Sequence, residues 1–137
     1  LGKIIKAFGA VPIDRENPQM QQILSIMKYL KSEHKVCVFP EGTRNKSGTN
    51  QLQDFKGGYI VFALKTKSPI VPIMMLNKGK PFKKTKMIIG EPIYLTEYYD
   101  KKLNDDEIEN INKIIRENMI KQQQILSDIK KKKDANS

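Results

Sequence analysis

The chain has very little cysteine and no long apolar run. Its single cysteine, Cys37, excludes a disulfide framework and makes a reducing compartment the simpler interpretation. This thiol lies within the apolar run 36–39, where a cysteine is usually a small core residue rather than a nucleophile. The longest apolar stretches, 59–64 and 70–76, are shorter than a bilayer requires. The sequence therefore predicts neither a disulfide-rich scaffold nor a membrane-spanning stretch within these residues.

Positive charge is the strongest compositional bias. Lys and Arg number 25 against 15 Asp and Glu, which gives a net charge of +10 at pH 7. This excess favours phosphates, anionic lipid, nucleic acid or an acidic protein as partners, without choosing among them. Nucleic acid has the least support, because the chain lacks interleaved aromatic residues and any recognisable nucleic-acid motif. A lysine cluster fits either a solvated loop or contact with anionic headgroups; it consists of Lys78, Lys80, Lys83, Lys84 and Lys86.

Strand-like and helix-like segments alternate along the chain. This order predicts an α/β fold with a mostly parallel central sheet, flanking helices and a C-terminal helix. The expected strands lie at 11–13, 36–39, 70–76 and 86–90, and the expected helices follow Pro18, span about 55–67 and follow a capping box at Asn104 and Glu107. The last helix has an apolar face that we predict from Ile108, Ile111, Ile115, Ile125 and Ile129. Residues 130–137 are predicted to form a lysine-rich disordered tail.

The most informative segment is 39–44, which reads Phe-Pro-Glu-Gly-Thr-Arg. It directly follows a predicted strand, and the carboxyl ends of strands are where open α/β sheets place their sites. Glycine allows a ligand to approach the backbone closely. The planar guanidinium of arginine matches phosphate oxygens. The segment therefore predicts a site for a small, polar, anionic ligand.

The order of the motifs resembles that of the glycerolipid acyltransferases typified by 1-acyl-glycerol-3-phosphate acyltransferase. Residues 39–44 are similar to the third motif of that family at every position. Residues 9–15 resemble the second motif, and 55–58 and 70–73 resemble blocks that follow the third. The resemblance extends from residue 1 to about residue 95. It implies a partial acyltransferase domain, which we expect to occupy residues 1–129.

One departure from the family concerns the catalytic base. The first motif of the family is a His followed five positions later by an Asp. The single histidine of this chain, His34, is followed at that spacing by Phe39, so we interpret it as a residue at a helix end. We therefore expect no catalytic residue in this chain, a natural N-terminus upstream of Leu1, and no acyl transfer by the 137 residues alone.

The resemblance also implies a reaction and its partners. A fatty acyl group would pass from acyl-CoA or acyl carrier protein to 1-acyl-glycerol-3-phosphate, giving phosphatidic acid for phospholipid biosynthesis, without a metal or other cofactor. The protein would be membrane-associated at the cytoplasmic face, in contact with an anionic membrane surface and not with nucleic acid. The substrate-binding residues implied are Arg15, Glu41, Gly42, Thr43, Arg44 and Lys56.

Two of these residues carry the expected binding chemistry. Arg15 and Arg44 would converge on the acceptor phosphate and orient it. Glu41 would orient an arginine or accept a hydrogen bond from an acceptor hydroxyl. The alternative interpretation is a non-catalytic module that binds phosphate or a lipid headgroup. A His-x-x-x-x-Asp pair encoded upstream of this chain would favour the enzyme.

Overall fold

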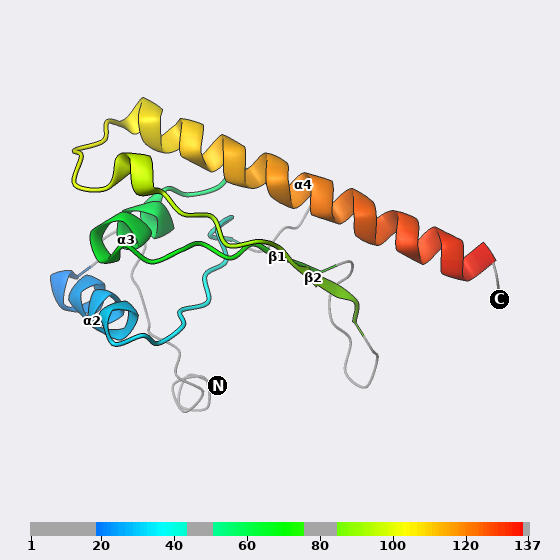
Figure 1. The fold of residues 1–137 in the computed structure, drawn as a ribbon, viewed down its shortest axis with the longest axis horizontal. Coiled ribbons are helices and arrows are strands. Elements are labelled where there is room, and N and C mark those ends of the chain that lie inside the picture. Colours follow the sequence, from blue (N-terminus) through cyan, green and yellow to red (C-terminus); the bar gives the residue numbers. More distant parts are fainter. Residues whose placement is uncertain (1–18, 44–50, 76–84, 136–137) are drawn as a thin grey trace. The chain divides into compact units, whose positions relative to one another are not determined.

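The computed structural model describes residues 19–43, 51–75 and 85–135 (Figure 1). The chain divides into two compact units, Leu1–Val38 and Phe39–Ser137. Within the described ranges, no helix combines the length and the apolar character needed to cross a membrane. The elements, in chain order, are α2 (Met20–Lys31), α3 (Gly58–Thr66), β1 (Ile73–Met75), β2 (Met87–Ile89), the 3-10 helix η1 (Thr96–Tyr98) and α4 (Asp105–Ala135).

In the first unit, α2 is the helix predicted after Pro18. It begins at Met20, after an extended Gln19, and ends at Lys31. Lys28 and Lys31 lie in its last turn, where positive charge interacts favourably with the helix dipole. The prediction of this helix is confirmed.

The prediction of a buried strand at 36–39 is wrong. No strand is present at these residues, Val38 and Phe39 are 47% and 75% exposed, and the thiol of Cys37 is also exposed. An apolar run supplies the side chains for a buried strand, but a strand also needs a second backbone to accept and donate its hydrogen bonds. The described residues provide no such partner for 36–39.

The second unit contains a two-stranded sheet. β1 and β2 pair in antiparallel orientation, with Ile73 opposite Ile89 and Met75 opposite Met87. The strands predicted within 70–76 and 86–90 are thus present, but the described residues do not show a mostly parallel sheet. The short connection explains the orientation, because 76–86 comprises only 11 residues. A parallel pair needs a crossover of about a dozen residues or more.

The core of the second unit forms where α4 packs against α3, β1 and β2 (Figure 1). Along β1 the side chains alternate, so that Met74 is buried while Ile73 and Met75 are exposed. Most of the other buried residues come from α3, α4 and the segments that lead into them. The cluster comprises Phe55, Ile60, Ala63, Met74, Leu95, Ile111, Ile115, Met119 and Leu126.

The predicted capping box at the start of α4 is confirmed. The Glu107 N–H donates to Asn104 Oδ1 over 2.8 Å, and the Asn104 N–H donates to Glu107 Oε2 over 2.9 Å. The two bonds satisfy amide groups that have no partner within the helix. Three acidic residues in the first turn add a favourable interaction with the helix dipole.

The buried face of α4 differs from the predicted face in its second half. Ile111 and Ile115 are buried as expected, but Ile125 is 52% exposed whereas Leu126 is 2% exposed. Three helical turns span about 11 residues, which brings Leu126, and not Ile125, back to the side of Ile115. Ile129 is also exposed, at 46%.

α4 also continues beyond the point at which the sequence predicts a tail. Residues 130–135 form its last turns and are not a disordered segment. Lysine and alanine have high helix propensity, and adding residues to an existing helix costs far less than nucleating one. A run of charge therefore does not by itself end a helix.

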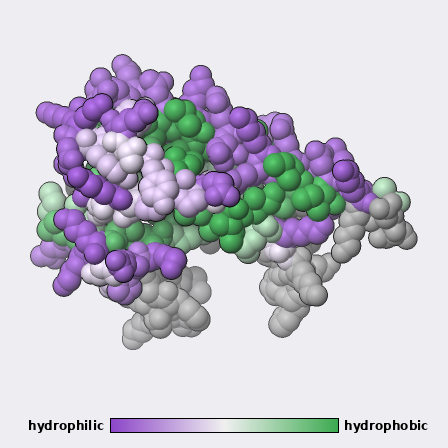
Figure 2. Space-filling model, viewed as in Figure 1, coloured by the Kyte–Doolittle hydropathy of each residue, from purple (hydrophilic) through white to green (hydrophobic). Residues whose placement is uncertain are grey.

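The sheet has one apolar face that the described residues leave uncovered. Figure 2, in the same view as Figure 1, shows apolar surface in the region of β1 and β2. Its exposed side chains are Ile73, Met75, Met87 and Ile89, each between 47% and 65% exposed.

Candidate substrate-binding loop

The loop after residue 38 is built around a tight turn at Gly42. The Gly42 N–H donates to the Phe39 carbonyl over 3.0 Å. Gly42 has a φ of +68°, in the left-handed region that side chains disfavour. A Cβ at this position would lie 3.2 Å from Lys56 Cγ. The turn therefore favours glycine, and it brings the backbone of Gly42 against the stem of Lys56.

Glu41 is held by a backbone group from a later part of the chain. The Gln53 N–H donates to Glu41 Oε2 over 3.1 Å. A second bond joins the same two segments, since the Lys56 N–H donates to the Pro40 carbonyl over 2.8 Å. The structure thus brings together three residues that the sequence predicts for one site, Glu41, Gly42 and Lys56.

The segment that holds Glu41 is itself tied to α4. Arg116 donates from Nε to the Gln53 carbonyl over 3.1 Å and from Nη2 to the Leu52 carbonyl over 2.6 Å. One turn earlier, Asn112 Nδ2 donates to the Phe55 carbonyl over 3.3 Å. Sequence reasoning missed both residues. The available signal was that Asn112 follows Ile111 and Arg116 follows Ile115 on the predicted apolar face. This spacing does not indicate which groups the two polar side chains contact.

Tyr59 connects α3 to the same region of α4. Its hydroxyl donates to Asn112 Oδ1 over 2.9 Å. Burial raises the pKa of Tyr59 well above its ordinary value, and the nearby Glu109 carboxylate raises it further. The phenol is therefore neutral at physiological pH and remains a hydrogen-bond donor.

Some of the predicted site residues are not placed by the structure. Arg15 and Arg44 lie outside the described residues, so the expected convergence of two guanidinium groups on one phosphate stays a prediction. Thr43 is described and exposed. The roles of these residues in substrate binding also remain predictions.

The single histidine occupies a helix end, as interpreted from the sequence. His34 follows α2; its N–H donates to the Tyr29 carbonyl over 3.1 Å, and its Nδ1 is 2.9 Å from the Ser32 carbonyl. A carbonyl oxygen only accepts, so Nδ1 carries the hydrogen in this bond. The imidazole also meets the Tyr29 ring edge-on, with 5.9 Å between ring centroids. These contacts all lie at the end of one helix.

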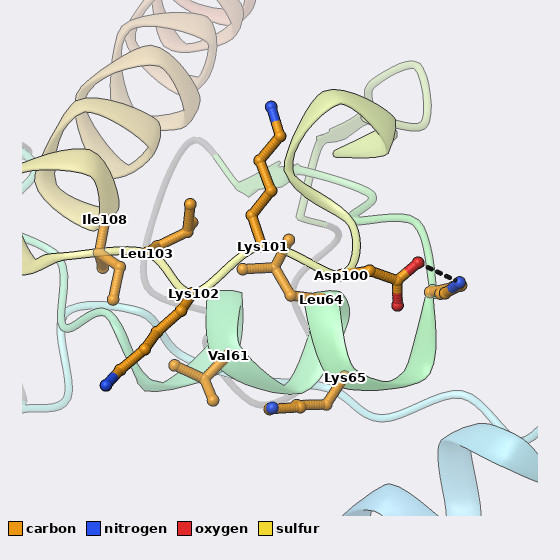
Figure 3. Close-up of a pocket in the computed structure, with 9 residues that line it drawn as sticks. Val61, Leu64, Lys65, Asp100, Lys101, Lys102, Leu103 and Ile108 are labelled. Atoms are coloured by element: carbon orange, nitrogen blue, oxygen red, sulfur yellow. Dashed lines mark hydrogen bonds and ion pairs between the residues drawn. The ribbon is translucent and has the colours of Figure 1, made fainter.

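A surface cavity of about 620 Å³ lies elsewhere in the second unit, between α3 and the segment that leads into α4 (Figure 3). Val61, Leu64, Leu103 and Ile108 form its apolar part. Four lysines also line it, but the side chains of Lys101 and Lys102 point in opposite directions (Figure 3). None of the described residues predicted for the site lines this cavity; its lysines are Lys65, Lys67, Lys101 and Lys102.

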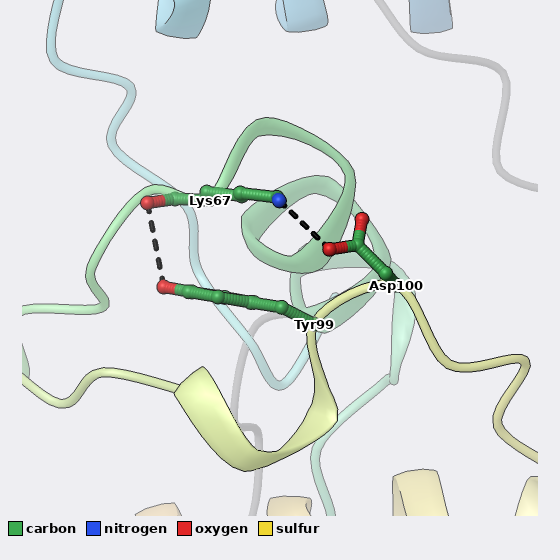
Figure 4. A network of polar contacts seen from close by, with 3 residues as sticks. All are labelled: Lys67, Tyr99 and Asp100. Atoms are coloured by element: carbon green, nitrogen blue, oxygen red, sulfur yellow. Dashed lines mark hydrogen bonds and ion pairs between the residues drawn. The ribbon is translucent and has the colours of Figure 1, made fainter.

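One of these lysines is paired at the rim of the cavity. Lys67 Nζ lies 2.8 Å from Asp100 Oδ2, and the Tyr99 hydroxyl donates to the Lys67 carbonyl over 3.4 Å (Figure 4). Both members of the ion pair are well exposed, so the pair contributes little to stability. Lys67 and Asp100 each have a positive φ, and Lys67 is the left-handed residue that ends α3. These contacts join the residue that ends α3 to Tyr99 and Asp100.

The sequence of the chain matches the family model described as "Acyltransferase" over residues 1–76, which is more than half of its length. The chain therefore belongs to the acyltransferase family. The motifs at 9–15, 39–44, 55–58 and 70–73 all fall within the matched residues.

Curated relatives carry a more specific name. The chain is similar to the 1-acyl-sn-glycerol-3-phosphate acyltransferase of Bacillus subtilis (strain 168), with 38% identity over 72% of this chain and 50% of the relative. It is 34% identical to the enzyme of that name from Streptococcus pneumoniae, over 78% of this chain and 40% of the relative. It is 32% identical to the one from Borreliella burgdorferi, over 86% and 49%. The chain thus spans half or less of the length of these relatives. No solved structure matches it.

Proposed function

We propose that this chain serves the transfer of a fatty acyl group to 1-acyl-glycerol-3-phosphate, which yields phosphatidic acid. The observation that carries the proposal is the organised loop at 39–43. In it Gly42 adopts a backbone geometry that glycine favours, and Glu41 is fixed by a hydrogen bond from Gln53. The names of the relatives, 1-acyl-sn-glycerol-3-phosphate acyltransferases, support the same reaction.

In this proposal the chain contributes acceptor binding. Arg15 and Arg44 neutralise and orient the acceptor phosphate, since guanidinium groups match phosphate oxygens in a bidentate way. Gly42 lets the acceptor approach the backbone, with Thr43 as a hydrogen-bond donor and Lys56 as an additional cation beside Gly42. Glu41 accepts from an acceptor hydroxyl or orients an arginine. Holding the hydroxyl and phosphate in one geometry lowers the barrier to attack on the thioester carbonyl.

The 137 residues contain no His followed five positions later by Asp. A general base must reach the proton that it removes, and His34 is engaged at the end of α2. This observation keeps a second candidate function open, a non-catalytic module that binds phosphate or a lipid headgroup. Both candidates predict acceptor binding by this chain, whereas the enzyme alone predicts turnover by the protein that the gene encodes.

The finer features of the reaction also belong to this proposal. We propose acyl-CoA or acyl carrier protein as the donor, no further cofactor, and work at the cytoplasmic face of an anionic membrane. The net charge of +10 supports each of these anionic partners. We also propose that a mostly parallel sheet forms around β1 and β2, a proposal supported by the alternation of strand-like and helix-like segments in the sequence. A solved structure in which neither strand has a parallel neighbour would refute this fold.

The experiment measures binding of the 137-residue chain to neutral vesicles with and without 1-acyl-glycerol-3-phosphate. We expect this lipid to increase binding, and Arg44→Ala to remove most of the increase. Lys121→Ala is the matched control, because it removes the same charge from an exposed position of α4. Equal losses in both variants would show nonspecific attraction and overturn the assignment of the loop.

Activity is measured separately as release of thiol from acyl-CoA in the presence of the same acceptor. We expect no release above buffer from the 137 residues and steady release from the protein that the gene encodes. Turnover by the 137 residues would show that the account of the missing base is wrong. Binding without turnover by the encoded protein would favour the non-catalytic module.

A further inference from the structure

Arg116 makes an unusual pair of contacts for a helix-surface arginine. Its guanidinium donates to the carbonyls of Leu52 and Gln53, two consecutive residues that lie 64 and 63 positions earlier in the chain. An arginine remains charged at all physiological pH values, and its fork holds two acceptors in a fixed geometry. Hydrogen bonds from a charged donor are also stronger than neutral ones.

One of the two contacts of Arg116 leads directly to Glu41. The Leu52 carbonyl and the Gln53 N–H belong to the same peptide group. Arg116 Nη2 donates to the oxygen of that group, and the N–H of the group donates to Glu41 Oε2. A peptide whose oxygen accepts from a cation becomes a better donor at its nitrogen, because hydrogen bonds in a chain polarise one another. One peptide thus links a cation on α4 to the carboxylate in the loop.

The element that carries Arg116 is firmly anchored. Ile115, directly before Arg116, and Met119, one turn later in α4, are 2% and 8% exposed within the core. Asn112 reaches the same segment from the preceding turn, through its bond to the Phe55 carbonyl. A side chain on a packed helix places its partners more precisely than one on a loop.

We propose that Arg116 is a positioning residue for the substrate-binding loop. It fixes the 52–53 peptide so that the N–H of this group sets the orientation of the Glu41 carboxylate. Arg116 itself does not touch the acceptor. Its importance for acceptor binding rests on the proposed function, but its effect on the Gln53 amide does not.

The test measures hydrogen exchange at the Gln53 amide by NMR, without any ligand. In Arg116→Ala we expect exchange at Gln53 to rise at least about tenfold, as for the loss of one stabilising hydrogen bond. Amides in the middle of α3 and α4 should keep their rates. Lys113→Ala, which removes a charge from an exposed position of the same helix, should leave Gln53 unchanged.

Two further variants separate positioning from a general loss of structure. Arg116→Lys keeps the charge but offers no fork for two carbonyls, so its effect on Gln53 should be intermediate; it also serves if Arg116→Ala does not fold. Glu41→Ala should raise exchange at Gln53 as well, and the double variant Glu41→Ala/Arg116→Ala should add little to either single change. An unchanged Gln53 rate in both Arg116 variants, or fully additive effects, would overturn the proposal.

The vesicle assay then gives an independent readout. If Arg116 orients Glu41 for the acceptor, Arg116→Ala and Glu41→Ala should weaken binding to 1-acyl-glycerol-3-phosphate vesicles by similar factors. Wild-type protein that fails to bind these vesicles would count against the proposed function, while the Gln53 exchange data would still decide the positioning role. Normal binding by Arg116→Ala, with fast exchange at Gln53, would overturn the role of Arg116 in the site.

Discussion

Replacing Gly42 with alanine tests the geometry on which the candidate site depends. At a φ of +68° an alanine pays for the left-handed conformation, about 1–2 kcal/mol. The new Cβ would lie 3.2 Å from Lys56 Cγ, a tight contact that a flexible lysine can relieve by a small shift. Alanine also reduces the conformational entropy of the unfolded chain, which stabilises the folded state by about 0.4–1 kcal/mol. We therefore expect Gly42→Ala to lower the free energy of unfolding by about 1 kcal/mol.

Gly58 provides a matched control for the same substitution. It begins α3, and a Cβ there would meet nothing within 4 Å. We expect Gly58→Ala to raise the free energy of unfolding by about 0.5–1 kcal/mol, because alanine favours helix and restricts the unfolded chain. The two variants of identical chemistry should thus shift stability in opposite directions.

The assay is urea denaturation followed by circular dichroism, since the chain has no tryptophan. Gly42→Asn should lose less stability than Gly42→Ala, because asparagine tolerates the left-handed region better. If Gly42→Ala were as stable as Gly58→Ala, residue 42 would not adopt the left-handed turn. The described geometry of the substrate-binding loop would then be wrong.

Three further predictions concern the framework that holds the loop. Asn104→Ala should lower the free energy of unfolding by about 1 kcal/mol through loss of the capping box. Asn110→Ala, at an exposed position of α4, should not lower it, and urea denaturation measures both variants. Tyr59 has a raised pKa, so its contribution to stability is complete below its ordinary pKa of 10.0 and is lost as the pH rises above it. Tyr59→Phe should therefore cost about 1 kcal/mol near neutral pH and fall less steeply in stability above about pH 10, measured by denaturation across that range. Among the described residues, Gln122 Oε1 is a buried acceptor without a hydrogen-bond partner, while Nε2 donates to Asn118 Oδ1. Gln122→Met should raise the thermal midpoint, because removing the unpaired acceptor stabilises the fold more than losing the bond to Asn118 destabilises it.

Each of these predictions has a result that would contradict it. Equal losses in Asn104→Ala and Asn110→Ala would mean that the capping box does not stabilise α4. A pH dependence of Tyr59→Phe that matches the wild type would show that the phenol ionises normally in the folded chain. A lower thermal midpoint in Gln122→Met would indicate that Oε1 has a partner, such as a bound water.

Local signals in the sequence predicted the parts of the fold that depend on neighbouring residues. The capping box at Asn104 follows from a side chain and an amide three residues apart, and it is present. The helix predicted after Pro18 is also present, as α2. Such features depend on backbone geometry over a few positions, so they hold in any tertiary context that preserves the turn or helix.

Predictions that needed a distant partner were less successful. The apolar run 36–39 has strand composition, but no strand forms there. Alternation of segments does not set the orientation of β1 and β2, whose short connection makes them an antiparallel pair. In each case, the outcome depends on which backbone or surface lies opposite, and residue spacing does not encode it.

The same distinction explains why the sequence could identify Glu41 but not its support. Glu41 stands within a motif of six residues, so its candidate role follows from its immediate neighbours. The Gln53 amide reaches Glu41 across 12 positions of the chain, and Arg116 reaches the Leu52 carbonyl of the same peptide group across 64. Any residue other than proline supplies those backbone groups, so no residue type at position 53 marks the contact. If the 52–53 peptide positions Glu41 for the acceptor, substitutions of Gln53 that keep its N–H should leave acceptor binding intact, whereas Gln53→Pro should weaken binding at least as much as Glu41→Ala does.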